Sequence, residues 1–113
     1  MPLINVKTNA EFTKQKETQL KAQLGQAITA IPGKSESWLM IGIEQGQTMY
    51  FKGTDEPCAM VNVSIYGSAS ASAYEDLTGR IDDILSSLLG IDKARIYTAY
   101  FPTNDWGWNG RNF

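Results

Sequence analysis

The apolar residues of the first 43 positions change their spacing twice, which predicts a strand, a helix and a second strand. Leu3 to Val6 is a short strand-like run, and Trp38 to Ile43 is a dense apolar run of strand length. Thr8 and Glu11 have the spacing of a capping box, which predicts that a helix begins there. Pro32 and Gly33 predict its end. Between these signals the apolar residues recur at helical intervals and share one face; they are Phe12, Leu20, Leu24, Ala27, Ile28 and Ile31.

The second half of the chain repeats this order of elements. Cys58 to Tyr66 alternates apolar and polar residues, as expected of a half-buried strand. Ser72 and Glu75 again have capping-box spacing, and Gly90 is a typical residue for a helix C-terminus. Arg95 to Phe101 is the next predicted strand. The helix between them carries an apolar stripe made of Leu77, Ile81, Ile84, Leu85, Leu88 and Leu89.

A connector of residues 44–57 joins the two halves. Gly46 marks a turn in it, and Met49 to Phe51 is expected to form a short strand. The repeat of strand, helix and strand indicates an internal duplication, with a right-handed crossover between parallel strands in each unit. Two such units side by side predict an α+β fold (an α/β sandwich), in which a four-stranded mixed sheet carries two helices on one face. The length of 113 residues, 42% of them apolar, suits one domain spanning residues 1–113.

One face of this sheet lacks cover in the predicted fold. Trp38 to Ile41 is apolar at consecutive positions, so both faces of that strand require burial. Because a soluble monomer does not tolerate a large exposed apolar face, we predict a closed oligomer in which sheets cover one another. The tail of residues 105–113 holds Trp106, Trp108 and Phe113, and we expect it to pack as a short edge strand, on this subunit or a neighbour. Whether these rings only fill an interface or belong to a site stays open at this point.

The composition excludes several classes of function. The net charge is −2 and no basic footprint of a nucleic-acid binder is present. The chain has no histidine and a single cysteine, Cys58, which excludes Ser-His and Cys-His nucleophiles, the usual zinc sites and an intramolecular disulfide. Acid–base chemistry near neutral pH is left to a carboxylate, a lysine, a tyrosine or an amino-terminal amine. We find neither a signal peptide nor an apolar run of membrane-spanning length, so we expect a soluble cytoplasmic protein without membrane insertion.

Two residues are candidates for chemistry. Pro2 follows Met1, and removal of the initiator would leave a secondary amine at the start of an apolar strand. Burial or a nearby cation lowers the pKa of such an amine, and the neutral form can act as a general base. Lys34 follows the end of the first helix, where it either binds a carboxylate or interacts with the negative end of the helix dipole.

Five motifs together resemble the macrophage migration inhibitory factor family of the tautomerase superfamily. Their order and spacing match over essentially the whole chain. They are Met1-Pro2 before an apolar strand, Gly33-Lys34 after the first helix, the segment 56–59 (EPCA), the segment 95–97 (RIY) and the segment 107–110 (GWNG). The resemblance implies a homotrimer of duplicated β-α-β units with a keto-enol tautomerase site at each subunit interface.

The resemblance also implies a role for each site residue and a substrate class. Pro2 is the expected catalytic base, and Lys34 of the same subunit is expected to bind the substrate carboxylate and polarise the nearby oxygen. The pocket is expected to be lined by Tyr66, Tyr97 from the adjacent subunit, Trp106, Trp108 and Phe113. The expected reaction is cofactor-free and metal-free tautomerisation of phenylpyruvate-type α-keto acids and dopachrome-type substrates.

The chain departs from the family's mammalian members at several positions, which bear on the alternatives. Cys58-Ala59-Met60 lacks their second cysteine, so we expect no thiol–disulfide oxidoreductase activity. Ala99 replaces an asparagine of the site, and Tyr66 replaces an isoleucine. The alternative function is a secreted, cytokine-like protein that binds a host cell-surface receptor and keeps only a vestigial pocket. A related dehalogenase or decarboxylase is disfavoured because Arg80, Arg95 and Arg111 have no place in the expected pocket.

Overall fold

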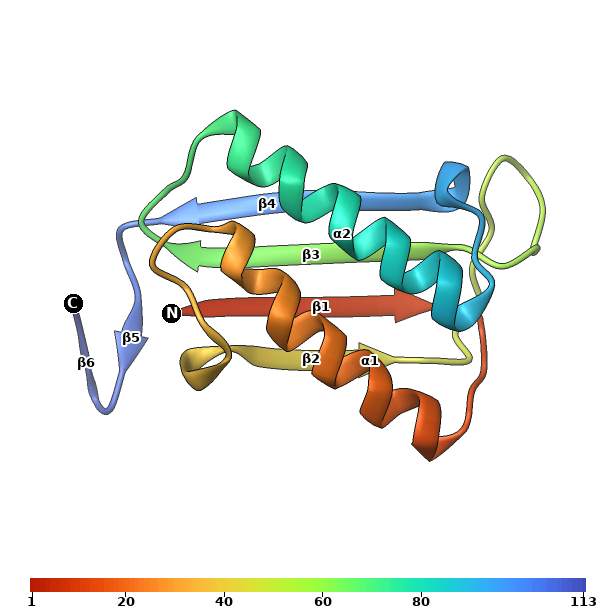
Figure 1. Cartoon of the computed structure of the whole chain (residues 1–113), viewed down its shortest axis with the longest axis horizontal. Coiled ribbons are helices and arrows are strands. Elements are labelled where there is room, and N and C mark those ends of the chain that lie inside the picture. The colour runs from red at the N-terminus through yellow and green to blue at the C-terminus, as the bar shows by residue number, and fades with distance from the viewer.

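Two β-α-β units lie side by side and form one four-stranded mixed sheet with both helices on the same face (Figure 1). The computed structural model describes all residues, 1–113. The predicted α+β class and the duplication are confirmed. The first unit consists of β1 (Pro2–Thr8), α1 (Lys14–Ala27), the 3-10 turns η1 (Ile28–Ala30) and η2 (Glu36–Trp38), and β2 (Met40–Glu44). The second consists of β3 (Ala59–Tyr66), α2 (Ala71–Leu89), the 3-10 turn η3 (Lys93–Arg95) and β4 (Ile96–Thr103), followed by the hairpin of β5 (Gly107–Trp108) and β6 (Arg111–Asn112).

The sheet order is β2-β1-β3-β4, which places the first strands of the two units in the centre. Strands β1 and β2 are parallel, β1 and β3 antiparallel, and β3 and β4 parallel. The alternation of Val61, Val63 and Ile65 turns these fully buried side chains toward the helices. They pack on the stripes of α1 and α2, where Leu24 and Ile81 are also fully buried. No helix in the structure combines the length and the apolar content needed to cross a bilayer.

Neither helix begins at its predicted capping box: α1 begins later than predicted and α2 begins earlier. Thr8 does not cap α1, because its buried hydroxyl donates to the carbonyl of Cys58 at 2.7 Å. Thr13 caps the helix instead, by accepting from the backbone N–H of Lys16 at 3.2 Å. In the second unit Ser70, not Ser72, accepts from an N–H of the first turn, and Gly90 ends α2 in the left-handed conformation as predicted. Helix α1 ends at Ala27 rather than at Pro32, since the chain continues there as a 3-10 turn.

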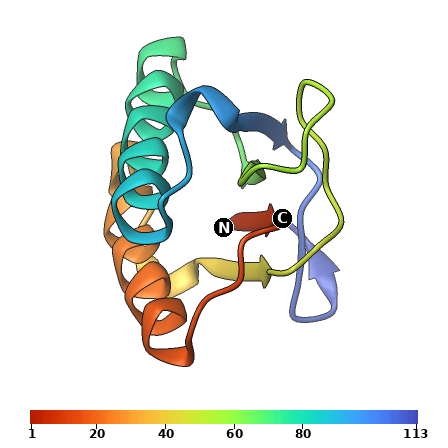
Figure 2. The same ribbon diagram turned by 90° about the vertical axis from the view of Figure 1, so that its right-hand side faces the viewer.

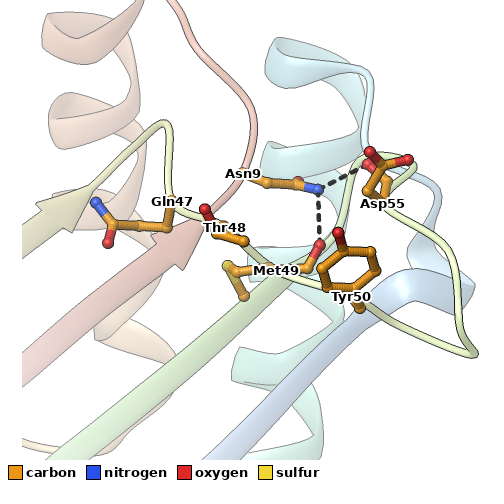
Figure 3. A pocket seen from close by; sticks show the side chains of 6 residues that line it. All are labelled: Asn9, Gln47, Thr48, Met49, Tyr50 and Asp55. Atoms are coloured by element: carbon orange, nitrogen blue, oxygen red, sulfur yellow. Dashed lines mark hydrogen bonds between the residues drawn. The ribbon is translucent and has the colours of Figure 1, made fainter.

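Two further segments differ from the predicted strands. Trp38 lies in the 3-10 turn η2, and β2 begins only at Met40. Residues 49–51 form no strand, because the carbonyls of the connector are bound by side chains. Figure 3 shows the amide of Asn9 donating to the carbonyls of Met49, at 3.5 Å, and Asp55, at 3.0 Å. The tail is built from short strands, but β5 and β6 pair with each other and not with the edge of the sheet.

The connector and the carboxyl-terminal hairpin both lie on the side of the sheet away from the helices (Figure 2). They do so at opposite ends of the strands, the hairpin beside the amino terminus and the connector beside the start of β4 (Figure 1). The sheet face between them is open. Large apolar side chains remain exposed on it and at its edges, among them Met40 at 69% and Phe101 at 53% of their surface. This is the uncovered face that the sequence predicts.

Candidate active site

Pro2 is buried at the amino end of the central strand β1. A proline fits there because it occupies the first position of the strand, opposite Ile65, where it costs the sheet little hydrogen bonding. The preceding residue, Met1, is held by its carbonyl, which accepts from the backbone N–H of Tyr66 at 3.0 Å. The amino terminus is therefore fixed against the end of β3.

The side chain of Lys34, in the loop after the first helix, also binds at the end of β3, beside the amino terminus. Gly33 adopts a φ of 80°, and this left-handed turn after the first helix directs the chain back over the sheet. The ammonium group of Lys34 donates to the backbone carbonyl of Tyr66 at 2.9 Å. The pKa of the α-amino group of Met1 is lowered, first by burial and then by the charge of Lys34 and hydrogen bonding to it. The site thus favours a neutral amine at the start of the chain.

A cavity of about 590 Å³ opens beside Pro2, and its lining is mostly apolar. Pro2, Trp106 and Trp108 line it, as the resemblance implies. The other lining residues are Met1, Leu3, Ser37, Trp38, Leu39, Met40 and Gly107. Since Met1 is part of the lining, removal of this residue would both enlarge the cavity and free the nitrogen of Pro2.

Aromatic rings form a continuous row from η2 to the end of β3, in which Trp38 and Trp108 line the cavity and Phe113 and Tyr66, both expected in the pocket, lie outside its lining. Trp38 meets Trp108 edge to face at 5.5 Å between ring centroids. Trp108 and Phe113 follow at 6.3 Å, and Phe113 and Tyr66 at 5.2 Å. The hairpin that carries Trp108 is closed by a hydrogen bond from the N–H of Phe113 to the carbonyl of Trp106 at 3.1 Å. The tail is therefore packed against the rest of the protomer, and its residues Trp106 and Trp108 form part of the cavity lining.

Tyr97 lies far from this cavity in the protomer. It pairs with Met60 near the start of β3, whereas Pro2 pairs with Ile65 near its end. Five residues of strand separate the two positions, a distance of roughly 17 Å along the sheet. The ring of Tyr97 is 61% exposed and contacts Phe51 of the connector edge to face at 4.9 Å. One chain alone does not bring Tyr97 to Pro2.

Trp38 and Met40 are lining residues that the sequence analysis did not assign to the site. It interpreted residues 38–43 as one strand of the core, although the residues before β2 form the 3-10 turn η2. The short sequence separation from Lys34 could have indicated that Trp38 belongs to the site, because Trp38 comes only four residues after Lys34. No group of three or more histidine, cysteine, aspartate or glutamate side chains is arranged to hold a metal ion.

Comparison with known proteins agrees with this arrangement. The family model of macrophage migration inhibitory factor (MIF) matches residues 1–113. Macrophage migration inhibitory factor of Mus musculus is 29% identical over 115 aligned residues, covering 100% of this chain and 99% of the mouse protein. D-dopachrome decarboxylase of Gallus gallus is 29% identical, covering 94% of this chain and 90% of the chicken protein.

The crystal structure of Leishmania major MIF2 has the same fold. It superposes with a TM-score of 0.92 at 31% sequence identity, covering 100% of this chain and 97% of that chain. The family match and the structural match both extend over the full length, including the amino-terminal strand and the carboxyl-terminal hairpin that form the cavity. The chain belongs to the macrophage migration inhibitory factor family of the tautomerase superfamily.

Proposed function

We propose that this protein is a cofactor-free keto-enol tautomerase of phenylpyruvate-type α-keto acids, with Pro2 as the general base. The observation that carries the proposal is the meeting of three features at one point. At the start of β1 a buried proline lines an aromatic cavity, and the ammonium group of Lys34 lies beside the amino terminus. Family membership supports the reaction class.

The base requires a free and neutral nitrogen. In the chain with Met1 the nitrogen of Pro2 is an amide and carries no basic lone pair. After removal of Met1, the secondary amine of Pro2 would occupy the environment that lowers the pKa of the Met1 amine, namely partial burial and a nearby Lys34. A neutral amine at pH 7 can remove a proton from carbon.

The proposed reaction needs no cofactor and no second substrate. Pro2 takes a proton from the carbon beside the carbonyl, and the electrons of that C–H bond form the carbon–carbon double bond of the enolate. Negative charge develops on the carbonyl oxygen, where the ammonium of Lys34 stabilises it. Protonated Pro2 then gives this proton to that oxygen, which completes the enol and restores the neutral amine, and the reverse sequence returns the keto acid. The carboxylate of the substrate is expected to bind Lys34 as well, which orients the reacting carbon.

The lining of the cavity supports an aryl side chain on the substrate. Trp38, Trp106 and Trp108 offer flat apolar surfaces that exclude water and keep the local dielectric low. A low dielectric disfavours the protonated amine and so assists the base. The name of the chicken relative, D-dopachrome decarboxylase, supports dopachrome-type compounds as further substrates.

A homotrimer completes the proposed site. The open sheet face and the exposed side chains of Met40 and Phe101 require cover from other subunits. An adjacent subunit is proposed to supply Tyr97, which lies at the far end of the sheet from Pro2 in its own chain. The proposed pocket therefore combines Pro2, Lys34 and the hairpin of one subunit with Tyr97 of the next.

The test is the ketonisation of phenylpyruvate enol, followed by absorbance, with the processed protein and a Pro2→Gly variant. We expect the processed protein to accelerate the reaction and the variant to lose about 100-fold or more in kcat/KM, the usual size of a general-base contribution. Mass spectrometry of both samples establishes that Met1 is absent. A Lys14→Gln variant on the outer surface of α1 is the control, and its activity should equal that of the wild type.

Absence of activity above background in the processed wild type would refute the enzymatic proposal and favour the receptor-binding alternative. Full activity in Pro2→Gly would leave the enzyme class intact and refute the assignment of the base. These two outcomes are distinct because they come from different samples of the same assay.

A further inference from the structure

Arg95 makes an unusual set of contacts at the end of the sheet opposite to Pro2. Its half-buried guanidinium donates to four backbone carbonyls and takes part in no salt bridge. The acceptors all belong to the connector; they are Pro57 at 3.0 Å, Phe51 at 3.1 Å, Thr54 at 3.2 Å and Glu56 at 2.9 Å. One side chain thus fixes the whole tip of this loop.

The tip is a tight two-residue turn. Phe51 and Thr54 exchange backbone hydrogen bonds of 2.9 and 3.1 Å, and Lys52 and Gly53 between them have φ values of 51° and 78°. Positive φ at both central residues is the pattern of a type I′ turn. The left-handed conformation of Lys52 is sterically unfavourable for a residue with a side chain. The turn is therefore held by its surroundings, and Arg95 bonds the carbonyls at both of its ends, Phe51 and Thr54.

Phe51 transmits this geometry to Tyr97. The guanidinium carbon of Arg95 lies 5.1 Å from the centroid of the Phe51 ring, within cation–π range. The same ring meets Tyr97 edge to face at 4.9 Å. Tyr97 is 61% exposed, so Phe51 is the main support for the orientation of its ring. Arg95, Phe51 and Tyr97 form one packed unit on the connector side of β4.

We propose that Arg95 is a positioning residue for the active site of the neighbouring subunit, acting through Phe51 on Tyr97. This inference rests on the proposed function, in which Tyr97 enters the pocket of the next subunit. The sequence analysis found no place for Arg95 in the pocket. In the proposed role Arg95 stays outside the pocket and acts on it indirectly, through Phe51 and Tyr97. Lysine cannot replace Arg95, because a compact ammonium group cannot reach the four carbonyls that the broader guanidinium binds.

The kinetic test compares Arg95→Lys with Arg80→Lys. Arg80 pairs with Asp76 on the outer surface of α2 and serves as the matched control. For phenylpyruvate, we expect Arg95→Lys to raise KM by about 5- to 10-fold with kcat changed less than about twofold, since a binding wall is displaced while Pro2 and Lys34 are untouched. Arg80→Lys should leave both constants unchanged. A Phe51→Leu variant should raise KM similarly, and the double variant should be no worse than the worse single one, because the residues act as a unit.

The second test does not depend on activity. Protein labelled with 3-fluorotyrosine gives a fluorine resonance for Tyr97, which is assigned by its loss in Tyr97→Phe. This resonance should shift in Arg95→Lys and in Phe51→Leu, but not in Arg80→Lys. Thermal unfolding and sedimentation show whether each variant keeps the fold and the assembly. If Arg95→Lys does not fold, Arg95→Gln carries both tests, because Phe51→Leu leaves Arg95 in place.

The outcomes separate the two proposals. An inactive wild type overturns the proposed function, and a fluorine resonance that moves in Arg95→Lys still supports the positioning of Tyr97. An unchanged resonance overturns the positioning role whether or not the wild type is active. Lower stability with unchanged KM and an unmoved resonance would assign Arg95 a purely structural role.

Discussion

The ammonium group of Lys34 donates to the backbone carbonyl of Tyr66 across 2.9 Å, and this bond joins the end of the first helical segment to the end of β3. The amino terminus lies beside it, since the N–H of Tyr66 donates to the carbonyl of Met1. A cation is therefore fixed next to the first residues of the chain by the backbone alone. Its effect on a neighbouring amine can be measured as a shift in pH dependence.

Lys34→Gln should move the acidic limb of the activity profile to higher pH. The proposed base works when neutral, so activity rises as pH increases through the pKa of the amine. For the amine of Met1, burial is the first cause that lowers the pKa and Lys34 the second, and we expect the amine of Pro2 to be affected in the same way. Without Lys34 the pKa of that amine should rise, so the base becomes neutral only at higher pH. We also expect kcat/KM at the plateau to fall by about 100-fold, because the enolate loses its cation. A pH–rate profile of kcat/KM checks both, and an unmoved limb would contradict the coupling.

Retention of Met1 or an amino-terminal tag should abolish turnover. The nitrogen of Pro2 is then an amide, and Met1 also occupies part of the cavity wall. The comparison uses one preparation before and after treatment with a methionine aminopeptidase, with the mass recorded each time. A tagged protein with the full activity of the processed one would exclude Pro2 as the base.

Intrinsic fluorescence should report binding at the cavity. The chain has three tryptophans, and all three line the cavity. Titration with 3-phenylpropionate, an aryl carboxylate that cannot tautomerise, should change the tryptophan emission along a saturable curve. Trp38→Phe should reduce the amplitude and keep the curve, because two reporters remain and the edge-to-face contact with Trp108 is retained by a smaller ring. Saturable binding measured by calorimetry without an emission change would place the ligand elsewhere.

Asp82→Asn should stabilise the protein at neutral pH. Burial raises the pKa of Asp82 above its ordinary value, Lys93 opposes the shift and Asp83 adds to it, and one carboxylate oxygen has no hydrogen-bond partner. A folded-state pKa above the unfolded one means that ionised Asp82 destabilises the fold, and that stability rises as pH falls through the folded pKa. Because solvent screens this partly exposed carboxylate, we expect a gain of only about 0.5 kcal/mol in the free energy of unfolding at pH 7, fading toward pH 4.

The control for this change is Asp83→Asn. Asp83 is exposed and pairs with Lys93, so its substitution should give no gain at either pH. Urea unfolding at both pH values measures the two variants. Equal gains for Asp82→Asn at pH 7 and pH 4 would mean that the charge is not the cause.

The sequence predicted the elements that depend on local pattern. The alternation around Val63 and the C-cap at Gly90 depend on residues near in sequence, and both were right. The first capping box was placed wrongly because the hydroxyl of Thr8 binds the carbonyl of Cys58, 50 positions away, a partner that no local pattern reveals. The strand expected at residues 49–51 failed for a similar reason, since Asn9 binds the carbonyl of Met49 and Arg95 binds that of Phe51.

The site was predicted in part. Pro2 was a candidate from the residues themselves, the pocket role of the tail tryptophans came from the resemblance, and the cavity brings them together. Trp38 was missed because a run of apolar residues looks the same whether it enters the core or lines a pocket. The role of Arg95 could not be seen either, because its four acceptors are backbone carbonyls, which every residue possesses.

The position of Pro2 and Tyr97 at opposite ends of one sheet has a genetic consequence. A chain with a defective Pro2 and a chain with a defective Tyr97 carry their lesions in different halves of the proposed pocket. When the two are co-expressed, some assemblies place an intact Pro2 opposite an intact Tyr97, and part of the turnover should return. Two alleles that are each inactive would thus complement one another within a single mixed oligomer.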